Sequence, residues 1–136
     1  MQASISIANQ IANIPIALDF CEELSEKCDI NPKVAIKLSL ALDEILSNTI
    51  NYGYTDDNEH KIDINFSMFK DSLSAEIIDD GAEFNPLLQD APNLDSDLEN
   101  RKIGGLGIHL VKSFADSLSY SHENNKNILL VKIGLS

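Results

Sequence analysis

The chain has 136 residues, enough for one domain with a buried core, and its 43% hydrophobic and 24% charged residues are typical of a globular protein. Its formal net charge of −12 argues against direct binding to nucleic acid or to an anionic membrane surface, because both would repel it. No stretch approaches the ~20 apolar residues of a membrane span, and no secretory signal is recognisable, so we expect a cytoplasmic protein.

The first half of the chain predicts one strand followed by two helices. Polar and apolar residues alternate in SISIA, residues 4–8, which is typical of a strand. Residues 15–28 have helical spacing and begin with a proline, whose missing N–H is harmless in the first turn. A second helix is expected from Pro32 to about Gly53, since proline favours a helix start and glycine a helix end.

The second half predicts two hairpins on either side of a third helix. Residues 61–69 and 73–79 both alternate, and they are joined by a short turn near residues 70–71. Residues 117–122 and 127–134 predict a closing hairpin in the same way.

The third helix is expected to start in the glycine-rich stretch GGLG and to run to about Leu118, with Leu110, Phe114 and Leu118 on one face. The order of elements contains no repeated parallel crossover, which excludes a doubly wound fold. The pattern therefore predicts an α+β protein: a two-layer α/β sandwich in which helices cover one face of a mixed, largely antiparallel sheet.

Polar residues interrupt the apolar stripe of the second helix. Glu44 and Asn48 are four residues apart, so they lie one above the other at the border between the core and solvent. Such a border can raise the pKa of a carboxylate and still admit a substrate, which would suit a general base. Taken alone, the same pair is also consistent with an ordinary solvated helix face.

A second polar group stands at a strand end, in IIDDGAEFNP, residues 77–86. Asp79 ends a strand that we expect to be buried, and Gly81 follows closely. The stretch predicts either a simple turn or a buried acid that accepts a hydrogen bond from a ligand donor such as an amino group. In the second case the site would discriminate sharply, because the wrong ligand would leave the acid unpaired.

The third feature is the stretch RKIGGLGIHLVKSF, residues 101–114. Glycine within a helix costs about 1 kcal/mol relative to alanine, so a cluster of glycines at a helix start requires a reason. The spacing fits neither the P-loop nor the dinucleotide-binding fingerprint. The cluster is either a turn or a place where free N–H groups hold phosphate oxygens, with Arg101 and Lys102 as the cationic complement.

Together, in this order and spacing, the three features resemble the ATP-binding fold shared by gyrase, heat-shock chaperones, histidine kinases and mismatch-repair ATPases. Within that superfamily the chain is most similar to the anti-sigma-factor serine/threonine kinases. LALDEILSNTINYGY resembles their N-box, IIDDGAEFNP their first glycine box, and RKIGGLGIHLVKSFADSLSY their second. The resemblance runs from about Ile14 to the C-terminus and implies one ATP-binding kinase-like domain over residues 1–136, with residues 85–103 as the ATP lid.

The same resemblance implies roles for individual residues, with ATP and Mg²⁺ as cofactors. Glu44 would be the catalytic base that takes a proton from a serine hydroxyl or from water, and Asn48 would be the Mg²⁺ ligand. Asp79 would pair with the adenine amino group, with Gly81 beside the ring. The expected nucleotide-binding residues are Asn48, Asp79, Gly81, Phe84, Arg101, Gly104, Gly105, Leu106 and Gly107.

The activity implied is phosphorylation of an anti-sigma-factor antagonist, with a sigma factor as a second partner and a homodimer as the assembly. Two alternatives remain open: a nucleotide-dependent binding module that transfers no phosphate, and a simple ATPase. The acidic residues of segment 85–103 are consistent with solvation of a loop or with recognition of a partner. The resemblance places Arg101 near the γ-phosphate, but the adjacent Lys102 is an alternative for that position.

Overall fold

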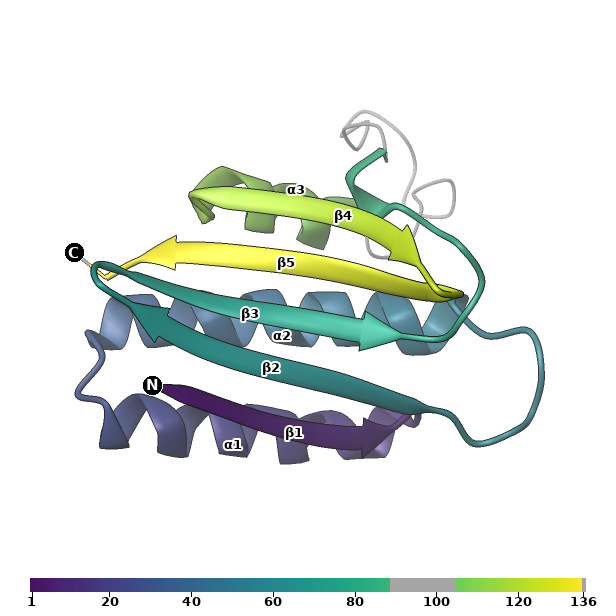
Figure 1. Ribbon diagram of the computed structural model, residues 1–136, viewed down its shortest axis with the longest axis horizontal. Helices are drawn as coiled ribbons and strands as arrows, with labels where there is room; N and C mark the ends of the chain where they lie inside the picture. The colour runs from purple at the N-terminus through teal and green to yellow at the C-terminus, as the bar shows by residue number, and fades with distance from the viewer. Residues whose placement is uncertain (89–104, 136) are drawn as a thin grey trace.

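Figure 1 shows the computed structural model, which describes residues 1–88 and 105–135. Within those residues, three α-helices cover one face of a five-stranded sheet, in the order β1-β2-β3-β5-β4. The strands are β1 (Gln2–Ala8), β2 (Lys61–Phe69), β3 (Ser72–Asp79), β4 (Ser117–Glu123) and β5 (Lys126–Gly134). The α-helices are α1 (Ile14–Lys27), α2 (Pro32–Tyr52) and α3 (Gly105–Phe114), and short 3₁₀ turns lie at η1 (Ile11–Asn13) and η2 (Pro86–Leu88).

All four strand pairings are antiparallel, so the described sheet is antiparallel throughout and not mixed. The α+β class and the two-layer arrangement are confirmed. None of the described helices is long and apolar enough to cross a bilayer.

The starts and turns of the elements have local causes. Helix α2 begins at Pro32, and the side chain of Asn31 accepts a hydrogen bond from the backbone N–H of Lys33 at 2.9 Å, which caps the helix. The β4–β5 hairpin turns at Asn124 and Asn125, which both have positive φ angles (53° and 62°). Asparagine tolerates this left-handed conformation, which matches the twist of the two strands.

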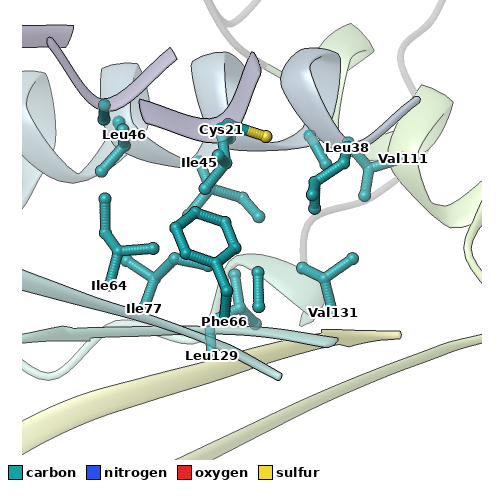
Figure 2. Close-up of a cluster of buried hydrophobic side chains, with 14 of the residues drawn as sticks. Cys21, Leu38, Ile45, Leu46, Ile64, Phe66, Ile77, Val111, Leu129 and Val131 are labelled. Atoms are coloured by element: carbon teal, nitrogen blue, oxygen red, sulfur yellow. The ribbon is translucent and has the colours of Figure 1, made fainter. Parts of the chain in front are cut away.

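The core lies between the helices and the sheet, where alternate strand residues meet the apolar faces of α1, α2 and α3. Figure 2 shows side chains from both layers, with Leu38, Ile45 and Leu46 of α2 facing Ile64, Phe66 and Ile77 of the sheet. In β3 and β5, alternate residues face the core, and at one end of the sheet these core-facing residues are polar: Asp79 and Asn127. That end is where the candidate site is found.

The end of the third helix differs from the prediction. Helix α3 stops at Phe114, and Leu118 belongs to β4, opposite Val131 of β5. The backbone N–H of Asp116 donates a hydrogen bond to the carbonyl oxygen of Lys132 in β5 at 2.9 Å. The chain has therefore joined the sheet at this point, and α3 cannot continue for another helical turn. The core side of α3 is Ile108 and Val111, whereas Leu110 is 53% exposed. The expected Leu110–Phe114–Leu118 face was therefore wrong.

Candidate functional site

A pocket lies where β3 ends, β5 begins and the C-terminal half of α2 passes over the sheet. Its lining is mostly apolar, with a few polar groups: Ile45, Asn48, Thr49, Gly53, Ile77, Asp79, Ala82, Phe84, Pro86, Ile108, Tyr120, Asn127 and Leu129. Its cavity volume is about 30 Å³, room for one or two water molecules. A larger planar ligand therefore enters only if lining side chains move.

Asp79 and Asn127 form the polar centre of this pocket. They are direct cross-strand partners in the β3–β5 ladder, and both are more than nine-tenths buried. Asp79 Oδ1 accepts hydrogen bonds from Asn127 Nδ2 and from the backbone N–H of Gly81, both at 2.9 Å. Among the described residues no donor bonds to Oδ2, which leaves this oxygen for a ligand. Burial raises the pKa of Asp79, and the two hydrogen bonds oppose that rise.

Asn127 is a site residue that our sequence reasoning missed. Its Nδ2 also donates to the carbonyl oxygen of Ala82 at 2.9 Å, and its Oδ1 accepts from the backbone N–H of Phe84 at 3.3 Å and from the hydroxyl of Tyr120. One buried amide thus holds Asp79 and the segment after β3 together. The sequence did contain a sign of it, because Asn127 is a polar residue at one of the alternating positions of β5 that are otherwise apolar and buried.

Glu44 and Asn48 lie one turn apart on α2, as predicted. Asn48 Nδ2 donates to Glu44 Oε1 at 3.2 Å, and the Asn48 side chain is buried. Removal from water raises the pKa of Glu44, while the bond from Asn48 opposes the rise and the nearby Asp43 adds to it. A carboxylate with a raised pKa, partly open to solvent, is suited to proton transfer near neutral pH.

The carboxylate of Glu44 lies against the first turn of α3. A Cβ atom built on Gly107 would be 2.0 Å from Glu44 Cδ, so the glycine leaves the space that the carboxylate fills. The first turn of a helix has N–H groups without partners in the helix, and it carries a partial positive charge. The candidate base is thus next to a helix start of the kind that binds phosphate.

Gly53 and Gly81 connect α2 to the segment that follows β3. The carbonyl oxygen of Gly53 accepts a hydrogen bond from the backbone N–H of Ala82 at 2.7 Å. A Cβ atom on Gly81 would lie 2.3 Å from the same oxygen, so any side chain there would displace backbone. The small size of Gly81 therefore serves this contact with α2, and Gly81 is not among the residues that line the pocket.

Tyr54 and His60 form a cluster beside Asp79. Their rings stack with centroids 4.6 Å apart, and His60 bonds to Asp80 through Nδ1 (3.1 Å) and to Asp56 through Nε2 (2.8 Å). The two hydrogen-bonded carboxylates raise the pKa of His60. The Tyr54 hydroxyl is buried and has no hydrogen-bond partner among the described residues. Burial raises its pKa, and the nearby carboxylates of Asp79 and Asp80 raise it further.

Three of the predicted site residues that the structure describes line this pocket. Asn48, Asp79 and Phe84 line it, and Gly105 begins α3. Leu106 lies in the first turn of the same helix. Arg101, Gly104 and the expected lid beyond Leu88 fall outside the described residues.

The pocket also permits a test of the expected Mg²⁺ ligand. The hydrogen bond of Asn48 to Glu44 uses only Nδ2, so the amide oxygen remains available to a cation. Residues 1–88 and 105–135 contain no cluster of three acidic, histidine or cysteine residues that could hold a metal by themselves. One amide oxygen suits Mg²⁺ when substrate phosphates supply the other ligands, so the residues present fit the ion.

Residues 7–133 match the family described as histidine kinase-like ATPase domain. The chain is 26% identical to serine/threonine-protein kinase BtrW of Bordetella bronchiseptica over 113 residues, which cover 83% of this chain and 80% of that protein. It is 25% identical to serine-protein kinase RsbW of Bacillus velezensis and 20% identical to RsbW of Listeria monocytogenes, in each case over 99 residues and 70% of this chain. The matches span less than two thirds of these two proteins, 62% and 63%.

A crystal structure of the RsbU and RsbW domains of a Mycobacterium tuberculosis protein superposes on 98% of this chain with a TM-score of 0.70. The sequence identity is 11%, and the match covers 31% of that longer chain. This likeness supports the fold.

Proposed function

The chain belongs to the family of histidine kinase-like ATPase domains, and from that premise we propose that it is an ATP-dependent serine/threonine protein kinase. The observation that carries the proposal is the position of Glu44. Its carboxylate has a raised pKa, is held by Asn48 and lies against the first turn of α3. A module that only bound nucleotide would not need a base at that point.

The adenine ring enters the apolar pocket with its amino group toward Asp79. Since Oδ1 already accepts two hydrogen bonds, Oδ2 is the oxygen that receives the amino hydrogen. Phe84, which is partly exposed at the pocket, covers the ring. The phosphates lie toward the start of α3, where the proposed contacts are Arg101, Gly104, Gly105, Leu106 and Gly107.

Phosphoryl transfer then requires little chemistry from the protein besides position and charge. Asn48 would hold Mg²⁺ through its amide oxygen, and a bound ion would supply positive charge beside the phosphates. Glu44 accepts the proton of the attacking serine hydroxyl, and the serine oxygen takes the γ-phosphoryl group as ADP leaves. The raised pKa of Glu44 makes it a stronger base than an ordinary glutamate.

The relatives named RsbW and BtrW guide the choice of partners. The acceptor is an anti-sigma-factor antagonist, and the kinase sequesters a sigma factor when it is not engaged with the antagonist. The protein works as a homodimer in the cytoplasm. Residues 1–136 form one domain, with residues 85–103 as the lid over the nucleotide.

The test is a single-turnover assay with radiolabelled ATP, Mg²⁺ and a purified anti-sigma-factor antagonist. Wild type should produce phosphoserine, and Glu44→Gln should slow transfer ~10²–10⁴-fold while ATP binding is kept. Glu23→Gln is the matched control, because it makes the same change at an exposed residue that lines neither pocket. If wild type binds ATP but never modifies the antagonist, the protein is a binding module. If it releases phosphate without any partner, it is an ATPase.

A further inference from the structure

A second hollow lies on the helical layer, away from the nucleotide pocket. Helices α1 and α2 run side by side in opposite directions, joined by residues 28–31 (Figure 1). The groove between them has a cavity volume of about 680 Å³. Its lining consists of Leu18, Glu22, Ser25, Glu26, Asp29, Ile30, Pro32, Ala35, Ile36, Ser39, Leu40 and Asp43, none of which lines the nucleotide pocket.

The groove presents large apolar side chains to solvent. Ile36 is 61% exposed and Leu40 is 48% exposed, and the two are one turn apart on α2. Leu18 of α1 is partly buried and Ile30 is nearly buried, so they complete an apolar floor. An exposed apolar patch with a polar rim is typical of a surface that binds another protein.

Every charged residue that lines the groove is acidic. Glu22, Glu26 and Asp29 lie on the α1 side and Asp43 on the α2 side, and all four are exposed. Lysines 27, 33 and 37 belong to the same helices or their ends but do not line the groove. This rim repels nucleic acid and anionic lipid, and it attracts a partner with basic side chains beside its apolar ones.

We infer that the α1–α2 groove binds an amphipathic helix of a partner protein, with leucine-type side chains on the floor and lysine or arginine at the acidic rim. A helix fits because its apolar side chains recur every three or four residues, as do Ile36 and Leu40 on the facing wall. A second copy that docked through the same groove is the poorer occupant, because its acidic rim would face an identical acidic rim. The inference goes beyond the proposed kinase activity and does not depend on it.

The test uses a labelled synthetic helical peptide of about 18 residues, with leucine along one face and lysine on both flanks. Fluorescence anisotropy without nucleotide should show saturable binding that weakens as salt is added. A peptide with glutamate in place of lysine should not bind. The double variant Ile36→Ser/Leu40→Ser should weaken binding at least about tenfold, and Glu22→Gln/Glu26→Gln at least about threefold.

Two control variants change the same properties elsewhere on the surface. Phe69→Ser removes an exposed apolar side chain, and Asp57→Asn/Glu59→Gln removes the same charge as the rim variant. Both should bind the peptide within about twofold of wild type. Equal losses in the groove and control variants, or no binding by wild type, would overturn the inference. So would a wild-type dimer in analytical ultracentrifugation that Ile36→Ser/Leu40→Ser makes monomeric.

Discussion

The carboxylate of Glu44 and a side chain at position 107 would occupy the same space, because a Cβ atom on Gly107 would be 2.1 Å from Glu44 Oε2. The glycine at the start of α3 therefore determines where the proposed base on α2 lies. Helix α2 supplies the acid, and α3 supplies the space for it.

Gly107→Ala should move the Glu44 carboxylate away from α3, because the glutamate end is flexible and the helix backbone is not. Alanine is the better helix former by up to about 1 kcal/mol, so the free energy of unfolding should stay the same or rise. Single-turnover phosphorylation should nevertheless fall by about tenfold or more. Full activity in this variant would remove Glu44 from the catalytic position.

Asp79→Asn should weaken ATP binding by ~1–3 kcal/mol, measured by calorimetry. The new amide oxygen can keep both bonds of Oδ1, so the amide NH₂ would point toward the amino group of adenine. ITP, which carries a carbonyl at that place, should lose less affinity than ATP or gain some. An unchanged ratio of ATP to ITP affinity would contradict the proposed adenine contact.

The same variant has an expected effect on stability. The pKa of Asp79 is raised in the folded protein, so the folded state binds this proton more tightly than the unfolded state. Ionisation of Asp79 as the pH rises toward neutral therefore costs stability. At pH 7 Asp79→Asn should unfold at the same urea concentration as wild type or at a higher one.

Asn48→Ala should shift the pH dependence of phosphorylation. Loss of the Nδ2 donor removes the interaction that lowers the pKa of Glu44, so this pKa should rise further. The rate, which falls when the base is protonated, should then begin to fall at a higher pH than in wild type. Ser47→Ala is the matched control, because Ser47 bonds to Asp43 instead. The variant should also respond less to added Mg²⁺.

Asn127→Ala should destabilise the fold by ~1–3 kcal/mol in urea unfolding, because it leaves the buried Asp79 and the backbone groups of Ala82 and Phe84 without their hydrogen bonds. Asn65→Ala provides the comparison. Asn65 bonds to Ser4 and Glu76 on the open face of the sheet, where water can replace the lost groups. Equal losses in the two variants would show that Asn127 has no special part in the pocket.

His60 should make stability depend on pH near neutrality. Its pKa is raised by Asp56 and Asp80, so its contribution is complete below the unfolded-state pKa of about 6.5 and is lost as the pH rises through the folded-state value. Unfolding midpoints measured across this range should fall more in wild type than in His60→Gln. Parallel pH curves for the two proteins would refute the prediction.

Much of the fold follows from local pattern. The alternation of polar and apolar residues in 61–69 and 73–79 predicts strands with one buried face. Prolines 15 and 32 indicate the helix starts without any knowledge of tertiary contacts. The Glu44–Asn48 pair is also local, because a helix places residues four apart on one side. These predictions are confirmed by the helices, the strands and the bond between the two side chains.

What depends on distant contacts was not predictable in this way. Asn127 is a site residue because β5 pairs with β3 in a register that places it opposite Asp79, 48 positions earlier. The end of α3 is decided by the bond of Asp116 to Lys132, and Gly81 is required by the carbonyl of Gly53, which caps the end of α2. Each of these needs the tertiary arrangement, which spacing along one segment does not contain.

The hydrogen bond between Ala82 and Gly53 is made by main chain on both sides. It joins the helix that carries the proposed base to the loop that follows the proposed adenine contact. The distance between the proposed base and the proposed adenine contact is therefore held in part by main-chain atoms, which most substitutions leave unchanged. Side chains at the two ends of the site can therefore change, and alter what the site binds, without changing this main-chain connection.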